Sequence, residues 1–208
     1  DGHIDRTLWN KAGEAGMLCS HIPEEYGGMA ADFLYSTVVI EEIGRLGLTG
    51  IGFSLHSDIV APYILHYGSE AQKQHYLPKL VSGEMVAAIA MTEPGAGSDL
   101  QGVKTTAVLD GDEYVINGSK TFITNGWLAD LVILVAKTDP KAGAKGTSLF
   151  LVEANTPGFS KGKRLEKVGM KAQDTSELFF QDVRVPKENL LGQPGMGFAY
   201  LMQELSLI

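Results

Sequence analysis

The chain has 208 residues, and its 44% of hydrophobic and 20% of charged residues are typical of a globular protein with a buried core, which excludes a disordered chain. The length predicts one or two domains. The formal net charge is −8, from 17 basic and 25 acidic residues, and the sequence lacks the dense basic patch that is typical of nucleic-acid-binding proteins.

Helices are predicted for the first part of the chain. Ile4, Leu8 and Ala12 recur at the spacing of one helix face. Residues 33–46 form a second apolar-rich segment, and Gly47 provides a stop just after it.

Two further helices are predicted before residue 83. Residues 51–67 are mostly apolar, so we expect this helix to be well buried, with Pro62 kinking or splitting it. Ser69 and Gln72 have the spacing of a capping box that opens the fourth helix. Pro78 is expected to disturb that helix near its end.

The pattern then changes to strands. Residues 103–109 and 113–116 are strand-like on either side of Asp110-Gly111, which is a strong hairpin signal. Asn117-Gly118 is predicted to turn the chain once more, into a strand at residues 120–124.

Continuous apolar runs predict buried strands at residues 131–136 and 148–152. Residues 177–185 are predicted to form a further strand, which ends at Pro186. A last helix begins at Gly197. One of its faces carries Phe198, Leu201, Met202 and Leu205.

The order of these elements predicts the α+β class. Helices come first and strands follow, whereas a Rossmann domain would alternate strands and helices along the chain. The sequence therefore argues against a Rossmann domain.

One cysteine, Cys19, is present, so no disulfide forms within the chain, and a reducing compartment is favoured. Met17 and Leu18 precede it, which predicts a buried structural thiol. No apolar segment is long enough to span a membrane. Residues 1–3 do not resemble the start of a signal peptide, and we expect that they follow a cut inside a longer protein.

Residues 91–126 carry the most specific pattern. They open with a small-residue loop at residues 94–99, in which glycines let backbone amides approach an anion such as a phosphate. The loop matches neither the GxGxxG fingerprint nor a P-loop.

This segment resembles the flavin-binding middle domain of the acyl-CoA dehydrogenases in two motifs, TEPGAGSD and NGSKTFITNG, and in their separation. The resemblance covers essentially the whole chain. Residues 171–180 and 197–205 are most similar to the long-chain type of this family.

The resemblance implies three parts: an N-terminal all-helical domain at residues 1–85, a middle β domain of barrel or sandwich type at residues 86–192, and the start of a C-terminal helical bundle at residues 193–208. FAD is expected in a cleft between the last two. An acyl-CoA is then dehydrogenated to a trans-2-enoyl-CoA, as in fatty-acid β-oxidation, and electron-transferring flavoprotein reoxidises the flavin. The resemblance also implies a homotetramer for the full-length protein, in the bacterial cytoplasm or the mitochondrial matrix.

By the same resemblance, two segments are expected to contact the flavin. They contribute Ile89, Met91, Thr92, Gly97 and Ser98 from the first segment and Phe122, Ile123 and Thr124 from the second. Ser98 is also expected to contact the pantetheine of CoA. Ala144 and Lys145 match a further CoA contact, where the lysine pairs with a phosphate.

Two positions depart from the family pattern. Many relatives have an aromatic residue at the position of Ile89 and a tryptophan at that of Phe122. A phenylalanine keeps a flat apolar face but loses the indole N–H. The Thr124 hydroxyl is the expected hydrogen-bonding partner near flavin N5.

Other titratable, basic and aromatic residues are interpreted structurally. Glu93 is expected to make a structural hydrogen bond rather than to act as a base. His56 and His66 lack the close helical spacing of a metal pair, so we predict no metal site. The basic run at residues 161–164 is expected to be a solvated loop or strand edge, and Phe179-Phe180 to place one ring inward and one outward.

No catalytic base is assigned. In most relatives the base lies in the C-terminal domain, and in the long-chain and isovaleryl types it lies on the helix that starts at Gly197. An ungapped count puts Ile208 at that position. Glu204 is one turn earlier, and we do not expect it to reach the same α-carbon.

The missing helical domain would supply half of the FAD cleft. We therefore expect the 208-residue chain alone to retain FAD weakly or not at all. Its visible spectrum tests this, because stoichiometric flavin absorption would contradict it.

Two other functions remain open on the sequence. An acyl-CoA oxidase or flavin monooxygenase would keep the fold and use O2 as the electron acceptor. A non-catalytic fragment would bind acyl-CoA or a partner without turnover. The acyl chain length is not fixed by these residues.

Overall fold

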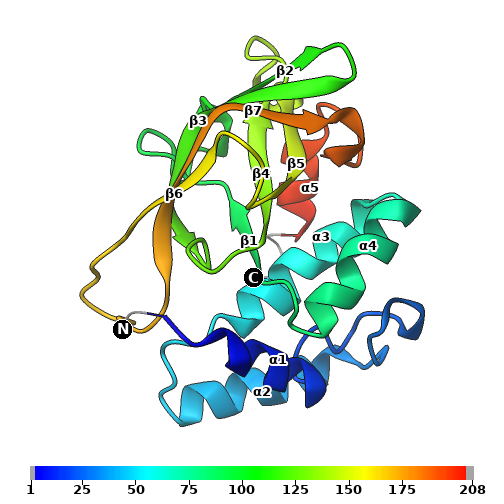
Figure 1. The fold of residues 1–208 in the computed structure, drawn as a ribbon, viewed down its shortest axis with the longest axis vertical. Coiled ribbons are helices and arrows are strands. Elements are labelled where there is room, and N and C mark those ends of the chain that lie inside the picture. Colours follow the sequence, from blue (N-terminus) through cyan, green and yellow to red (C-terminus); the bar gives the residue numbers. More distant parts are fainter. Residues whose placement is uncertain (1–2, 205–208) are drawn as a thin grey trace.

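The computed structural model describes residues 3–204, and its N-terminal part is helical, as predicted (Figure 1). The segments are α1 (Arg6–Glu14), the 3-10 turn η1 (Glu24–Tyr26), α2 (Phe33–Arg45), the π-helical η2 (Leu55–Val60), α3 (Ala61–Tyr67) and α4 (Glu70–Val81). The predicted third helix runs on without a break from π-helical η2 into α3, so the helix type changes just before Pro62, which lies in the first turn of α3.

The capping box at the start of α4 is confirmed. The Ser69 hydroxyl accepts a hydrogen bond from the Gln72 amide, and the Gln72 side chain accepts one from the Ser69 amide. These two bonds satisfy amides that the helix itself leaves unpaired. Pro78 lies in the last part of α4, and the helix ends three residues later, at Val81.

The second half of the chain forms a mixed sheet. Its strands are β1 (Ala87–Ala90), β2 (Thr106–Asp110), β3 (Glu113–Thr124), β4 (Leu131–Lys137), β5 (Thr147–Glu153), β6 (Phe159–Arg164), β7 (Thr175–Pro186) and β8 (Leu190–Leu191). They follow the order β6-β7-β3-β2-β4-β5-β8, with β1 pairing parallel to β4. Short 3-10 helices lie between them, namely η3 (Leu100–Gly102), η4 (Gly143–Gly146) and η5 (Lys187–Asn189).

Strand β4 is buried on both faces, because it lies between two hydrophobic cores. Val132 and Leu134 face one core, which they share with side chains of β3 and β7. Leu131 and Ile133 face the other core, which the N-terminal helices complete. A strand that is covered on both sides needs apolar residues throughout, as the sequence pattern of β4 indicated. The molecule therefore has two layers of strands, with the helices against one of them (Figure 1).

The hairpin at Asp110-Gly111 is confirmed, because β2 and β3 pair antiparallel with Asp110 opposite Glu113. The turn predicted at Asn117-Gly118 is wrong, because β3 runs through both residues. A register shift in the pairing of β3 with β7 takes its place. Asn117 exchanges hydrogen bonds with Asp182 on β7, at 3.0 and 2.9 Å.

Gly118 has a packing role in that strand. A Cβ atom on Gly118 would lie 2.3 Å from the Thr105 hydroxyl, so only glycine fits there. The dipeptide that is typical of a turn is therefore used here for a bulge and a close contact, both of which depend on tertiary structure.

The final helix, α5 (Gly197–Glu204), packs against α3 and β5 (Figure 1). Tyr200 stacks on Tyr67 with ring centroids 4.0 Å apart, and the His66 Nδ1 lies 2.9 Å from a Glu204 carboxylate oxygen. Of the predicted face, Leu201 is fully buried and Met202 is 43% exposed, whereas Leu205 lies outside the described residues.

Buried His56 links α4 to β1. Its Nδ1 accepts a hydrogen bond from the Ala87 amide at 3.0 Å, which leaves Nε2 to donate to the Leu80 carbonyl at 3.0 Å. Burial lowers the pKa of His56 to about 4, although the bond to Leu80 acts in the opposite direction. The folded protein thus holds this ring neutral.

We expect a pH-dependent loss of stability from this histidine. Because the unfolded chain takes up a proton on His56 near pH 6.5 and the folded one does not, the free energy of unfolding should fall by about 2 kcal/mol between pH 7 and pH 5. Urea unfolding at both values, compared with His56→Gln, measures this contribution. An equal fall in the variant would contradict the assignment.

Candidate functional site

The two motif segments meet side by side. Thr92 follows β1 and Thr121 lies near the end of β3, and the Thr121 amide donates a hydrogen bond to the Thr92 carbonyl at 2.9 Å. A surface is thus formed by residues 91–98 and 121–124, which are far apart in the sequence.

A bulge turns Phe122 outward. The pairing of β3 with β7 shifts between Lys120 and Ile123, and Phe122 takes a φ of +57°. A positive φ is uncommon for a bulky residue and is strained unless the surroundings impose it. Its ring is 66% exposed, while Ile123 points into the core with 2% exposure. The backbone therefore offers a flat apolar ring at this surface.

The small-residue loop is held by a tight turn. The Glu93 amide donates to the Ala96 carbonyl at 2.9 Å, and the Ala96 amide donates back to the Glu93 carbonyl at 3.1 Å. A Cβ atom on Gly95 or Gly97 would meet no other atom within 4 Å, and neither residue has a positive φ. The described contacts and the backbone conformation do not require glycine at these two positions, and the open space there would let a ligand approach the backbone closely.

Glu93 lies beneath that loop and is 7% exposed. Its carboxylate accepts hydrogen bonds from the Lys104 amide at 2.7 Å, the Thr105 amide at 3.0 Å and the Lys120 ammonium at 2.9 Å. Burial by itself raises the pKa of Glu93, but the hydrogen bonds from Thr105, Lys120 and Lys104 outweigh it and keep the pKa below its usual range. The predicted structural hydrogen bonding of Glu93 is confirmed.

Thr124 lines a cavity of about 510 Å³. One wall consists of Ile51, Gly52, Ser54 and Leu55, and the other of Lys167, Gly169, Met170, Gln173 and Thr175. The cavity thus lies between the segment before η2 and the loop before β7. A hydrogen bond from the Asn125 side chain to the Gly52 carbonyl, at 3.0 Å, joins β3 to the first wall.

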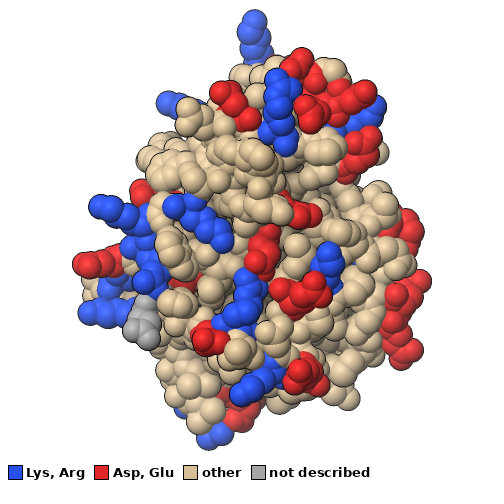
Figure 2. Space-filling view, viewed as in Figure 1, with Lys and Arg blue, Asp and Glu red and all other residues tan. Residues whose placement is uncertain are grey.

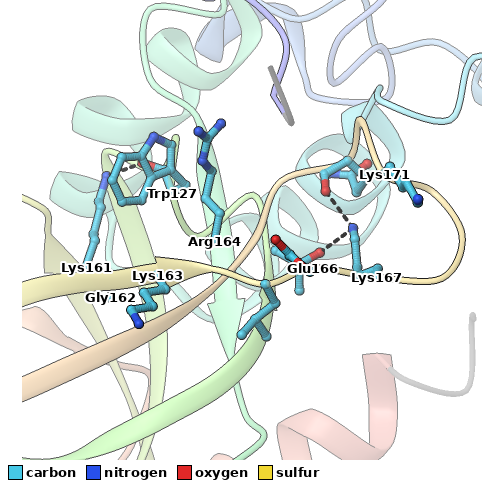
Figure 3. Close-up of a pocket in the computed structure, with 11 residues that line it drawn as sticks. Trp127, Lys161, Gly162, Lys163, Arg164, Glu166, Lys167 and Lys171 are labelled. Carbon is cyan, nitrogen blue, oxygen red and sulfur yellow. Dashed lines mark hydrogen bonds between the residues drawn. The ribbon is translucent and has the colours of Figure 1, made fainter.

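A larger, open cleft of about 940 Å³ adjoins this cavity, because Lys167, Gln173 and Thr175 line both (Figure 3). Five of its eleven lining residues are basic. The walls carry Lys161, Lys163, Arg164, Lys167 and Lys171, with Glu166 as the acid and Trp127 as the aromatic wall. Figure 2 shows this basic group at the left of the molecule.

Two of these lysines make hydrogen bonds within the protein itself. Lys161 donates to the carbonyl oxygens of Trp127 and Ala129, and Lys167 donates to Gln173 and Thr175. The run at residues 161–164 belongs to β6, the edge strand of the sheet, in agreement with the predicted strand edge.

The remaining predicted contact residues lie at different depths. Ile89 is buried in β1 at 5% exposure, and Ser98 is exposed in the loop. Ala144 and Lys145 lie in η4, between β4 and β5. Since β1 and β4 run parallel, the loop after β1 and η4 extend toward the same end of the sheet.

Three residues near the cavity were not predicted from the sequence. Gln173 donates to the Asn125 side chain at 3.1 Å, and Asp174 accepts the amides of Trp127 and Leu128 at 3.0 and 2.9 Å. Together with Thr175 they belong to the segment 171–180, whose likeness to the long-chain type was the signal that could have found them.

Other kinds of site find no support in the part of the chain that the structure describes. Among residues 3–204, no three His, Cys, Asp or Glu side chains gather closely enough to hold a metal ion. None of the helices in that range is long and apolar enough to cross a lipid bilayer. Cys19 is fully buried, and burial raises the pKa of its thiol to about 12, as expected for a structural cysteine.

Comparison with known proteins gives two family matches. The family described as acyl-CoA dehydrogenase, N-terminal domain, matches residues 1–84, and acyl-CoA dehydrogenase, middle domain, matches residues 88–183.

Individual relatives agree with these matches. The mitochondrial long-chain specific acyl-CoA dehydrogenase of Sus scrofa is 56% identical over 206 residues, which cover 98% of the chain and 48% of that protein. The crystal structure of an acyl-CoA dehydrogenase from Geobacillus kaustophilus has a TM-score of 0.96 at 58% identity, covering 98% of the chain and 54% of that structure. A Bacillus anthracis acyl-CoA dehydrogenase complexed with FAD has a TM-score of 0.91 at 42% identity, covering 97% and 34%. The chain spans about half the length of the curated relatives it matches.

Proposed function

The chain belongs to the acyl-CoA dehydrogenase family, and we therefore propose that the protein containing it dehydrogenates acyl-CoA thioesters with FAD. The observation that carries the proposal is the junction of Thr92 with Thr121, which places both motif segments around one surface beside a cavity. Thr92 contributes a hydroxyl group from the first segment and Thr124 one from the second.

The residues present fit FAD. Gly95 and Gly97 leave open space for a close approach of phosphates, and the exposed Phe122 ring offers an apolar face to an aromatic system. Bound FAD would supply the acceptor for a hydride, which no protein side chain provides.

We assign the contacts as follows. The backbone at Met91 and the hydroxyls of Thr92 and Thr124 orient the flavin ring. Gly97 and Ser98 approach its pyrophosphate. The substrate contacts Ser98, Ala144 and Lys145, where the exposed ammonium of Lys145 pairs with a CoA phosphate.

The proton-abstracting base is left unassigned among residues 3–204. Glu204 is 7% exposed, and its carboxylate is engaged with His66 at 2.9 Å. This engagement supports its exclusion as the base. Position 208, where an ungapped count places the base of the long-chain type, lies outside the described residues.

The substrate is proposed to be a long acyl chain, because of the likeness to the long-chain relatives. The partner is proposed to be electron-transferring flavoprotein, and the full-length protein a homotetramer, both as the family resemblance implies. The relatives named above come from mitochondria and from bacteria, so we propose the matrix or the bacterial cytoplasm as the location.

The test uses the whole protein that carries this chain. After purification with FAD, it is mixed without oxygen with acyl-CoA thioesters of increasing chain length. We expect the visible flavin absorption to bleach, most rapidly with long chains. A flavin that no acyl-CoA reduces would contradict the proposal. Fast reoxidation of the reduced flavin by air would favour the oxidase alternative.

Thr124→Val provides a finer check. The change removes one hydroxyl while keeping the shape of the side chain, so the bound flavin should be reduced about tenfold more slowly by acyl-CoA, as the loss of one hydrogen bond implies. Stopped-flow absorbance measures this rate. Thr106→Val, on β2, is the matched control and should leave the rate unchanged. Equal rates of flavin reduction in the two variants would show that the Thr124 hydroxyl does not contact the flavin.

A further inference from the structure

Lys120 is a fully buried lysine directly behind the proposed flavin surface. Its side chain has 0% exposure. The ammonium donates to the Met91 carbonyl at 3.0 Å and to a Glu93 carboxylate oxygen at 2.9 Å. Lysine is almost never buried to this extent unless it is paired.

These bonds hold three consecutive residues from β3. Lys120 fixes the carbonyl of Met91 and the carboxylate of Glu93, and the next residue, Thr121, donates its amide to the Thr92 carbonyl. Residues 91–93 are therefore held by hydrogen bonds from two adjacent residues of β3, Lys120 and Thr121. The flavin contacts are proposed on the side of residues 91–93 that faces away from Lys120.

Stability alone does not explain this ion pair. Removing two charges from water is costly, and well-packed apolar residues of similar volume are often as stabilising as a buried ion pair, or more so. Burial lowers the pKa of Lys120 to about 8, while the Glu93 carboxylate acts in the opposite direction. The ammonium is thus still mostly charged near neutral pH.

We propose that Lys120 is a positioning residue for the flavin. Through its bonds to Met91 and Glu93 it sets the orientation of the Met91–Thr92 peptide and of the small-residue loop at residues 94–99. The backbone of these residues then contacts the flavin ring in one fixed geometry. The inference rests on the proposed function, because it presupposes that FAD binds at this surface.

The test compares Lys120→Met with Lys137→Met in the whole protein. Lys137 is the matched control because it is also a buried lysine, with 4% exposure, and its ammonium is bonded to a backbone carbonyl, that of Gly143, in a different loop. For each variant we would measure the dissociation constant for FAD, the visible spectrum of the bound flavin and the melting temperature of the apoprotein.

The expected result separates positioning from folding. Lys120→Met should weaken FAD binding at least about tenfold and change the shape of the flavin absorption bands, whereas Lys137→Met should do neither. In Lys120→Met the buried Glu93 carboxylate has lost its ion-pair partner. The double variant Lys120→Met, Glu93→Gln replaces that carboxylate with a neutral amide. It should regain melting temperature relative to Lys120→Met without regaining FAD affinity.

Two outcomes would overturn the inference. If Lys120→Met binds FAD with the affinity and spectrum of the unmodified protein, Lys120 has no positioning role, even where the melting temperature falls. If the unmodified protein itself takes up no FAD, the proposed function fails and the positioning role fails with it.

Discussion

Gly97→Val is expected to weaken flavin binding by the whole protein strongly while leaving its fold unchanged. A side chain at this position would meet no atom of the described chain within 4 Å, and the residue has no positive φ, so the fold has no reason to reject it. A valine would instead occupy the space that a ligand needs for close approach to the backbone. We expect FAD affinity to drop by at least about a hundredfold, which corresponds to roughly 3 kcal/mol.

The experiment titrates apoprotein with FAD and follows the flavin spectrum, with the melting temperature recorded in parallel. Gly44→Val is the matched control, because Gly44 on α2 also has open space at its Cβ position and lies away from the loop. The control should bind FAD normally. If Gly97→Val binds FAD as tightly as the control does, the small-residue loop does not contact the cofactor.

Glu93→Ala is expected to lower the free energy of unfolding by about 3–5 kcal/mol, the range found when one partner of a buried ion pair is removed. The substitution would leave the Lys120 ammonium buried without its counter-charge. It would also remove the acceptor for the backbone amides of Lys104 and Thr105. The loss therefore comes from several unsatisfied groups at once.

Equilibrium urea unfolding measures this effect, and a double-mutant cycle with Lys120→Met isolates the pair. The double variant should lose less than the sum of the two single variants, because neither charge is then left alone. Glu93→Gln, which keeps a carbonyl acceptor, should cost less than Glu93→Ala. Full stability of Glu93→Ala together with loss of proton abstraction would instead identify Glu93 as a base and contradict our account.

Much of the fold could be predicted because its signals are local. The capping box at Ser69 and the hairpin at Asp110-Gly111 each depend on a few neighbouring residues. The outward Phe179 and inward Phe180 follow from the alternation of a strand, with 42% and 3% exposure.

The wrong turn at Asn117-Gly118 shows where local signals fail. Asparagine and glycine favour a turn when nothing else decides, but here Asp182 pairs with Asn117 and Thr105 packs on Gly118. Both partners are distant in the sequence, so no local pattern contains them. Tertiary contacts decided the conformation.

The candidate site shows the same division. Its two motif segments could be found from the sequence, as could their meeting at one surface through the family resemblance. The role of Lys120 could not be found, since it depends on its burial and on contacts with Met91 and Glu93 across the sheet. The wall that Gln173 and Thr175 provide likewise depends on how the loop before β7 folds back toward Gly52.

A crystal structure of the whole protein with FAD bound would show whether the flavin occupies this surface. We predict that the flavin ring lies against the backbone of Met91 and Thr92 and against residues 122–124, with the pyrophosphate over Gly97. A flavin bound elsewhere, with this surface covered by side chains of the protein itself, would contradict it.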